Sequence, residues 1–161
     1  MGFRSFMKNT ANHTIDVHRD ADALADVLSC GAVFPLVVTG SSMMPFLRSG
    51  RDTVLLHKTD RFYRGQIVLF RRKSGAFVLH RIRRICPDGR LLMNGDAQKW
   101  CEYIQRDQVL AEVISVSRNQ RDMNPNSMLS RVLRALWYPT RVFRPFLWRM
   151  YGLFRKLTKP K

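Results

Sequence analysis

The sequence contains few cysteines, few acidic residues near its end and no long apolar run. Its three cysteines, Cys30, Cys86 and Cys101, are odd in number and lack a paired spacing, so neither a disulfide framework nor a zinc site is indicated. We therefore expect reduced thiols in the cytoplasm. No apolar stretch approaches the roughly 20 residues that a membrane-spanning helix needs. Residues 1–14 are charged and lack a small-residue cleavage site, unlike a secretory signal.

The scarcity of acidic residues is greatest from residue 118 onward. There, eleven Lys and Arg accompany one acidic residue, Asp122, and the segment carries +10 of the formal net charge of +16. Such a segment indicates an anionic partner, because phosphate backbones and anionic lipid head groups both attract it by Coulombic force. No recognised nucleic-acid-binding module accompanies this charge, so nucleic acid is an unlikely partner and a membrane surface is the favoured one.

The 161 residues suffice for one compact domain with a core and are too few for two of ordinary size. A short helix is predicted over 20–29, where Asp20 is a candidate cap. After it the pattern changes to short runs rich in Val, Ile, Leu and Phe, punctuated by Gly, with hairpin signals at 73–75 and 87–89. This pattern predicts a mainly β fold. The predicted strands are 33–39, 53–57, 66–71, 77–85, 91–94 and 109–117.

The basic segment has a helical pattern of its own. Polar residues over 118–126 predict a linker, and 127–137 and 143–157 then repeat apolar residues at helical spacing. Aromatic residues on one side and cations on the other are typical of a helix lying in a membrane interface. The alternative is an amphipathic helix packed on the β domain or on a partner. The apolar positions are Leu129, Val132, Leu133, Leu136, Trp137, Phe143, Phe146, Leu147, Met150, Phe154 and Leu157.

A candidate serine nucleophile lies in the turn 40–45, Gly-Ser-Ser-Met-Met-Pro, directly after an apolar strand. A serine nucleophile needs a turn that exposes its hydroxyl, a base for its proton and N–H groups for the oxyanion. Gly40 allows close approach of the backbone, and Pro45 restricts its neighbours. His80, on a later strand, has an ordinary pKa of about 6.5 and suits the role of base. Asp96, at a strand end, is a candidate for holding the imidazole tautomer.

The order of these motifs resembles that of the type I signal peptidase superfamily, specifically its branch with a Ser-His pair. The run at 40–45 resembles the nucleophile box, in which the serine directly before Met is catalytic, which assigns Ser42. Residues 64–70 resemble the strand between nucleophile and base, and Leu-His-Arg-Ile at 79–82 resembles the base box. Gly-Asp at 95–96 resembles the later acidic box. Several boxes in the right order are more specific than any one of them.

The resemblance implies a coiled, mostly antiparallel β fold and a serine endopeptidase that cleaves a peptide or a leader or signal segment through an acyl-enzyme. Ser42 is then the nucleophile and His80 the general base, and no metal or organic cofactor is needed. Two departures bear on the site. Lys-type enzymes have an oxyanion-hole serine where Gly40 stands. Ser-His relatives carry a further acid six residues beyond the Gly-Asp aspartate, where this sequence has Glu102. The orienting acid is therefore Asp96 or Glu102.

One domain with two appendages is predicted: a signal-peptidase-like β catalytic domain over 33–117, preceded by an N-terminal segment with a short helix over 1–32 and followed by a basic helical tail over 118–161. We expect a peptide or protein precursor as substrate and a cytoplasmic protein held peripherally on an anionic membrane. The alternatives are a LexA-like self-cleaving regulator and a catalytically silent module that binds peptide or membrane. The cationic run 71–73 is most simply a solvated hairpin tip. The residues expected to line the substrate site are Gly40, Ser41, Met43, Met44 and Pro45, although the methionines also suit packing.

Overall fold

The structure is a computed structural model that describes residue 28 and residues 30–119, 121–125 and 127–137. The chain divides after Pro125 into two compact units, which are described separately. This division lies eight residues beyond the predicted boundary at 117. Apart from Leu28, which is helical, the predicted helix at 20–29 lies outside the described residues. The apolar pattern at 143–157 also lies outside them.

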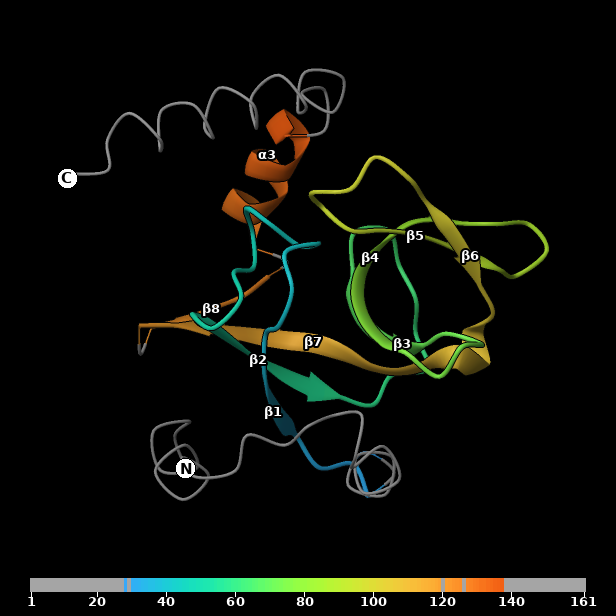
Figure 1. Cartoon of the computed structure of the whole chain (residues 1–161), viewed down its shortest axis with the longest axis horizontal. Helices are drawn as coiled ribbons and strands as arrows, with labels where there is room; N and C mark the ends of the chain where they lie inside the picture. The colour runs from blue at the N-terminus through green and yellow to red at the C-terminus, as the bar shows by residue number, and fades with distance from the viewer. Residues whose placement is uncertain (1–27, 29, 120, 126, 138–161) are drawn as a thin grey trace, which may run out of the picture. The chain divides into compact units, whose positions relative to one another are not determined.

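The described part of the first unit is one antiparallel sheet of eight strands (Figure 1). Its main path runs β1-β2-β7-β3-β4-β5-β6, and β8 pairs with β7 beside this path. All of the pairings are antiparallel. The prediction of a mainly β, antiparallel fold is therefore confirmed. The strands are β1 Phe34–Val37, β2 Asp52–His57, β3 Ile67–Arg71, β4 Phe77–Ile85, β5 Leu91–Asn94, β6 Glu102–Ile104, β7 Val109–Arg118 and β8 Arg121–Met123.

The predicted strands are all present, and β4 and β5 have the predicted bounds. Both predicted hairpin turns also form: the Gly75 N–H donates to the Arg72 carbonyl at 2.8 Å, and the Gly89 N–H donates to the Cys86 carbonyl at 3.0 Å. β6 and β8 were not predicted. β8 lies within the segment predicted to be a linker, so that part of the prediction is wrong. Pairing with β7, at the register Ser117↔Asp122, makes a polar segment part of the sheet.

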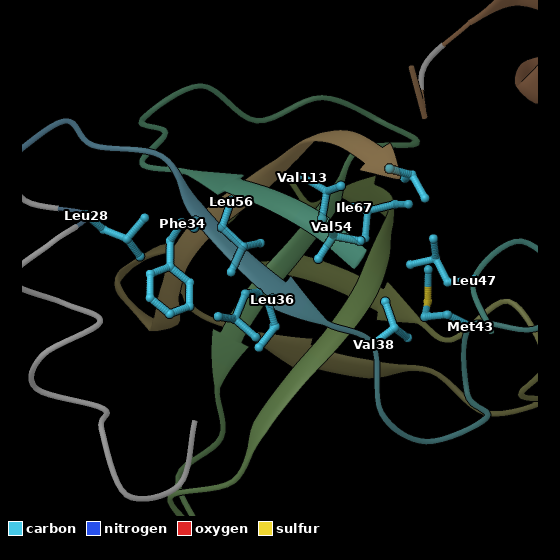
Figure 2. Close-up of a cluster of buried hydrophobic side chains, with 13 residues drawn as sticks. Leu28, Phe34, Leu36, Val38, Met43, Leu47, Val54, Leu56, Ile67 and Val113 are labelled. Carbon is cyan, nitrogen blue, oxygen red and sulfur yellow. The ribbon is translucent and has the colours of Figure 1, made fainter. Parts of the chain in front are cut away.

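The core consists of two hydrophobic clusters, one on each face of β3. The first cluster fills the space between β1, β2 and β7, and Ile67 and Leu69 of β3 belong to it (Figure 2). The second lies among β3, β4, β5 and β6, and includes Val68 and Phe70. Successive side chains of a strand point to opposite faces, which explains why β3 is a continuous apolar run. Full burial of one such side chain contributes about 1.5–3 kcal/mol, so both clusters hold β3 in place.

The register between β3 and β4 fixes which way the predicted base points. Val68 lies directly opposite His80, and Leu69 lies opposite Leu79. Opposite residues of an antiparallel pair share a face, so His80 faces the second cluster with Val68. Leu79 packs against the first cluster instead. A β-bulge between Ile82 and Arg84 then shifts the pairing of β4 with β5.

The described part of the second unit contains the helix α3, Met128–Trp137. This agrees with the predicted helical pattern over 127–137. The Ser127 hydroxyl accepts a hydrogen bond from the Ser130 N–H at 3.2 Å, which satisfies a backbone donor of the first turn. Val132, Leu133 and Leu136 are exposed. No helix within the described ranges is long and apolar enough to cross a membrane.

Candidate active site

The predicted nucleophile lies in the connection between β1 and β2. Ser42 is half-buried and Ser41 is exposed. Gly40 has a φ of +76°, a left-handed backbone conformation that residues other than glycine rarely adopt. The Met44 N–H donates to the Ser41 carbonyl at 3.2 Å, which closes the turn around Ser42. Glycine at position 40 therefore permits the sharp turn on which the predicted nucleophile lies.

Core packing anchors the end of this turn. Met43 is only 2% exposed and belongs to the first cluster, as does Leu47 (Figure 2). The Leu47 N–H donates to the Met43 carbonyl at 3.0 Å. Met44 and Pro45 are half-buried and joined by a cis peptide bond. Among the residues predicted to line the substrate site, Met43 thus packs in the core, whereas Gly40 and Ser41 are exposed.

A buried carboxylate holds the far side of the same connection. Asp52 accepts hydrogen bonds from the Arg48 N–H at 2.9 Å, from Arg51 Nε at 2.7 Å and from Arg118 Nε at 3.1 Å. Burial by itself raises the pKa of Asp52, but the hydrogen bonds from Arg51 and Arg118 outweigh it and lower the pKa to about 2. Arg118 Nη2 also donates to the Phe46 carbonyl at 2.7 Å. The connection is therefore tied to β2 and β7.

The loop after β5 approaches the backbone of Ser42. The Ala97 N–H donates to the Ser42 carbonyl at 2.8 Å. At Gly95, an added Cβ would lie 2.7 Å from that same carbonyl oxygen, closer than real Cβ contacts come. Position 95 must therefore be glycine for this approach. Since Asn94 pairs with Arg81 on β4, the loop connects the nucleophile turn to the strand that carries the predicted base.

His80 is almost fully buried, at 1% exposure. Its ring lies 5.9 Å from the Phe70 ring and 6.0 Å from the Trp100 ring, measured between centroids. Two aromatic rings therefore lie beside the imidazole. Nε2 is buried and has no hydrogen-bond partner among the described residues. A buried polar atom without a partner is rare in folded proteins and calls for an explanation.

Glu102 of β6 is the acid beside the imidazole. Its Oε1 lies 3.2 Å from His80 Nδ1, a long contact that lacks the alignment of a good hydrogen bond. Met93 lies opposite Glu102 in the β5–β6 pair and belongs to the second cluster, so the sheet places Glu102 on the face of His80. Arg72 engages both carboxylate oxygens, through Nη2 at 2.6 Å and Nε at 2.8 Å.

These surroundings set the protonation state of His80. Burial, the largest cause, lowers its pKa to about 4, and the positive charge of Arg72 acts in the same direction. The negative charges of Glu102 and Asp96 oppose this shift and raise the pKa. The imidazole is therefore neutral near pH 7, the form that accepts a proton.

Asp96, the other candidate acid, pairs with Arg81. Arg81 Nε and Nη2 donate to Oδ1 at 3.0 Å and to Oδ2 at 2.8 Å, and Arg81 Nη1 donates to the Gly65 carbonyl at 2.7 Å. Arg81 and Asp96 are both buried. Since Arg81 follows His80 directly on β4, its side chain points to the opposite face of the strand. The structure therefore brings Glu102 to His80 Nδ1 and Asp96 to Arg81.

Comparison with known proteins adds one finding to this geometry. A family model described as Peptidase S24-like matches residues 1–114, more than half of the chain. The chain belongs to the Peptidase S24-like family. This confirms the resemblance to the signal peptidase and LexA-like serine peptidase superfamily, and a serine-peptidase-like β fold. No curated protein matches the chain of this S24-like protein.

Two residues of the S24-like site were not predicted from the sequence. Arg72 was assigned to a solvated hairpin tip; that interpretation is wrong, because its guanidinium is half-buried against Glu102. Trp100 precedes β6, and its ring packs edge-on to His80. Neither residue belongs to a strand, so no local pattern marks its contact with Glu102 or His80.

The described ranges contain no group of three His, Cys, Asp or Glu side chains arranged to hold a metal ion. Within them, Cys30, Cys86 and Cys101 form no disulfide.

Proposed function

We propose that this S24-like protein is a serine endopeptidase that cleaves a peptide, or a leader or signal segment of a precursor, with Ser42 as nucleophile and His80 as general base. The observation that carries the proposal is the environment of His80. A carboxylate lies at Nδ1, while Nε2 is buried and without a partner. Leaving a buried polar atom unsatisfied costs about 1–3 kcal/mol, which a purely structural histidine would avoid. A general base that takes its proton from a serine hydroxyl when substrate binds explains this arrangement.

The proposed reaction has two halves. Ser42 Oγ attacks the carbonyl carbon of the scissile peptide and forms a C–O bond, while its proton moves to His80 Nε2. The tetrahedral intermediate then collapses: the C–N bond breaks, and the Nε2 proton passes to the leaving amine. In the second half, His80 takes a proton from water, whose oxygen forms a bond to the acyl carbon. The bond from that carbon to Ser42 Oγ then breaks, the Nε2 proton passes to Oγ, and the carboxylic acid product leaves. Each proton taken by His80 is returned, so the enzyme is regenerated.

We assign Glu102 as the acid that orients His80 in this reaction. It lies beside Nδ1 on the same face, and its charge favours the imidazolium that forms when Nε2 takes the proton. The contact of 3.2 Å is long, as is common for catalytic hydrogen bonds in structures without substrate. Asp96 contributes charge from a distance, while its carboxylate stabilises Arg81.

A fluorophosphonate probe tests this function without knowledge of the substrate. We expect the probe to label wild-type protein, the Ser42→Ala variant to take no label and the Ser41→Ala variant to keep most of it. Both variants should retain the wild-type melting temperature, because a surface or half-buried hydroxyl contributes little to packing. Labelling that persists in Ser42→Ala and disappears in Ser41→Ala would show that the nucleophile is misassigned. A folded wild-type protein that takes no label would favour the silent binding module, and a chain that only cleaves itself would favour the LexA-like regulator.

A further inference from the structure

Arg72 lies where the β3–β4 hairpin begins, and two groups fix its guanidinium. On one side it forms the two-pronged ion pair with Glu102, at 2.6 and 2.8 Å. On the other, its Cζ lies 5.5 Å from the centroid of the Trp100 ring, a cation–π contact. Trp100 also packs against His80. Arg72 therefore contacts both of the residues, Trp100 and Glu102, that lie beside the imidazole.

The ion pair shares one oxygen with the predicted base. Glu102 Oε1 lies 2.6 Å from Arg72 Nη2 and 3.2 Å from His80 Nδ1. The Glu102 side chain is 20% exposed, so it has a route to solvent. An unrestrained glutamate gains rotamer entropy, and the poorly aligned contact with Nδ1 is a weak restraint against that gain. The planar, two-pronged grip of Arg72 is the contact that fixes the carboxylate plane.

We propose that Arg72 is a positioning residue of the peptidase: it fixes the Glu102 carboxylate beside His80 Nδ1, so that the neutral imidazole keeps its proton on Nδ1 and leaves Nε2 open to the Ser42 hydroxyl. This inference rests on the proposed function. A neutral imidazole carries its proton on one nitrogen only, and an acceptor beside one of the two nitrogens keeps the proton there. Arg72 thus acts through Glu102 and touches no reacting atom.

A purely electrostatic effect of Arg72 on His80 can be distinguished from positioning of Glu102. Its positive charge lowers the pKa of His80, so a purely electrostatic role predicts a raised pKa and an unchanged tautomer when Arg72 is replaced. The charged groups around His80 are Glu102 of β6, Arg72 after β3, Asp96 after β5 and, on the opposite face of β4, Arg81. Removing Arg72 leaves both carboxylates and Arg81 in place. The tautomer of His80 therefore separates positioning from simple charge.

The test is a double-mutant cycle on full-length protein with the variants Arg72→Met, Glu102→Gln and the two combined. The first readout is the rate of Ser42 labelling by a fluorophosphonate. We expect each single variant to lose at least about tenfold, the factor that 1.4 kcal/mol of barrier represents. The combined variant should be no slower than Glu102→Gln, because the positioning effect of Arg72 passes through Glu102. Arg72→Lys, which keeps one donor, should restore part of the rate.

Arg71→Met is the matched control, since Arg71 precedes Arg72 and its guanidinium lies over the Phe77 ring, 5.6 Å from the centroid. It should label at the wild-type rate. The second readout is the ¹⁵N chemical shifts of the His80 ring at pH 7.5. We expect the Nδ1–H tautomer in wild type and Arg71→Met, and a mixture in Arg72→Met.

Losses that multiply in the combined variant, or a wild-type tautomer in Arg72→Met, would overturn the inference. Melting curves identify a variant that fails to fold, and Arg72→Lys then carries both readouts in place of Arg72→Met. If wild-type protein takes no label, the proposed function fails, while the ring shifts still decide whether Arg72 positions Glu102.

Discussion

Lowering the pH should weaken the folded state through His80. Burial lowers the pKa of His80 from its ordinary value of 6.5 to about 4. As the pH falls through 6.5, the unfolded chain binds a proton at this residue and the folded chain does not, so the free energy of unfolding decreases. The loss continues until the pH reaches about 4, where the folded protein also takes the proton. Above pH 6.5, His80 is neutral in both states and adds no pH dependence to the free energy of unfolding.

The size of this effect follows from the two pKa values. They differ by about 2.5, and each pKa unit corresponds to 1.36 kcal/mol, so wild type loses about 3 kcal/mol of stability between pH 6.5 and 4. That is a large part of the roughly 5–15 kcal/mol by which a domain is stable. Asp52 acts in a separate window. Its lowered pKa adds stability above 3.8 that is lost as the pH falls through about 2.

Urea unfolding followed by tryptophan fluorescence, at pH values from 4.5 to 7.5, measures the effect in wild type and in His80→Gln. Glutamine is of similar size and does not titrate, so its packing cost is the same at every pH. We expect the stability difference between the two proteins to shrink towards pH 4, with a slope of at most about 1.4 kcal/mol per pH unit. Parallel curves for the two proteins between pH 6.5 and 4 would refute this reasoning, because they would mean that His80 takes up its proton equally in both states.

Two further predictions concern the nucleophile turn and the basic tail. Gly95→Ala should lower the free energy of unfolding by about 1–3 kcal/mol and slow labelling of Ser42, because the added Cβ meets the Ser42 carbonyl oxygen. The control is Ala97→Gly, which keeps the N–H donated to that oxygen. Equal melting temperatures and equal labelling rates of the two variants would contradict the contact. Removal of residues 126–161 should abolish co-sedimentation with anionic vesicles, since each Lys or Arg near such a surface contributes about 1 kcal/mol of binding free energy. High salt should weaken binding of the full chain to the vesicles without abolishing it. Unchanged vesicle binding after truncation would exclude the tail as anchor, and a lowered melting temperature with aggregation would indicate packing on the β unit instead.

The strands that the sequence predicts well are those whose side chains alternate or are wholly apolar over several residues. β3 is buried on both faces and reads as a continuous apolar run, and the sequence predicts the bounds of β4. These patterns are local, so they predict both strands. The burial of His80, Arg81 and Ile82 in succession was not predicted, because it depends on packing against both faces of β4. Gly40 and Gly95 were also predictable as special positions, because each marks a place where the backbone must turn sharply or come close to another segment.

The position of Glu102 was not predictable in the same way. β6 is only three residues long, Glu-Tyr-Ile, and is a strand because β5 is already formed beside it. The sequence offered Asp96 as the orienting acid, from its place at a strand end, and the resemblance offered Glu102 as the alternative. What separates them is Arg81, which faces away from the imidazole and pairs with Asp96. Such a distinction depends on which side of β4 each carboxylate reaches, and this is set by tertiary pairing and not by local pattern.

The β-bulge between Ile82 and Arg84 has a consequence for where this chain tolerates insertions and deletions. Arg83 is the extra residue, and it separates the register at the hairpin tip, residues 86–90, from the register at Arg81↔Asn94. Residues added to the tip lengthen a turn and leave the pairing on the other side of the bulge unchanged. Loss of one residue between His80 and the bulge shifts the pairing by one, which turns each displaced side chain to the opposite face. We therefore expect length differences among relatives to collect at 86–90 and to be absent from 80–83.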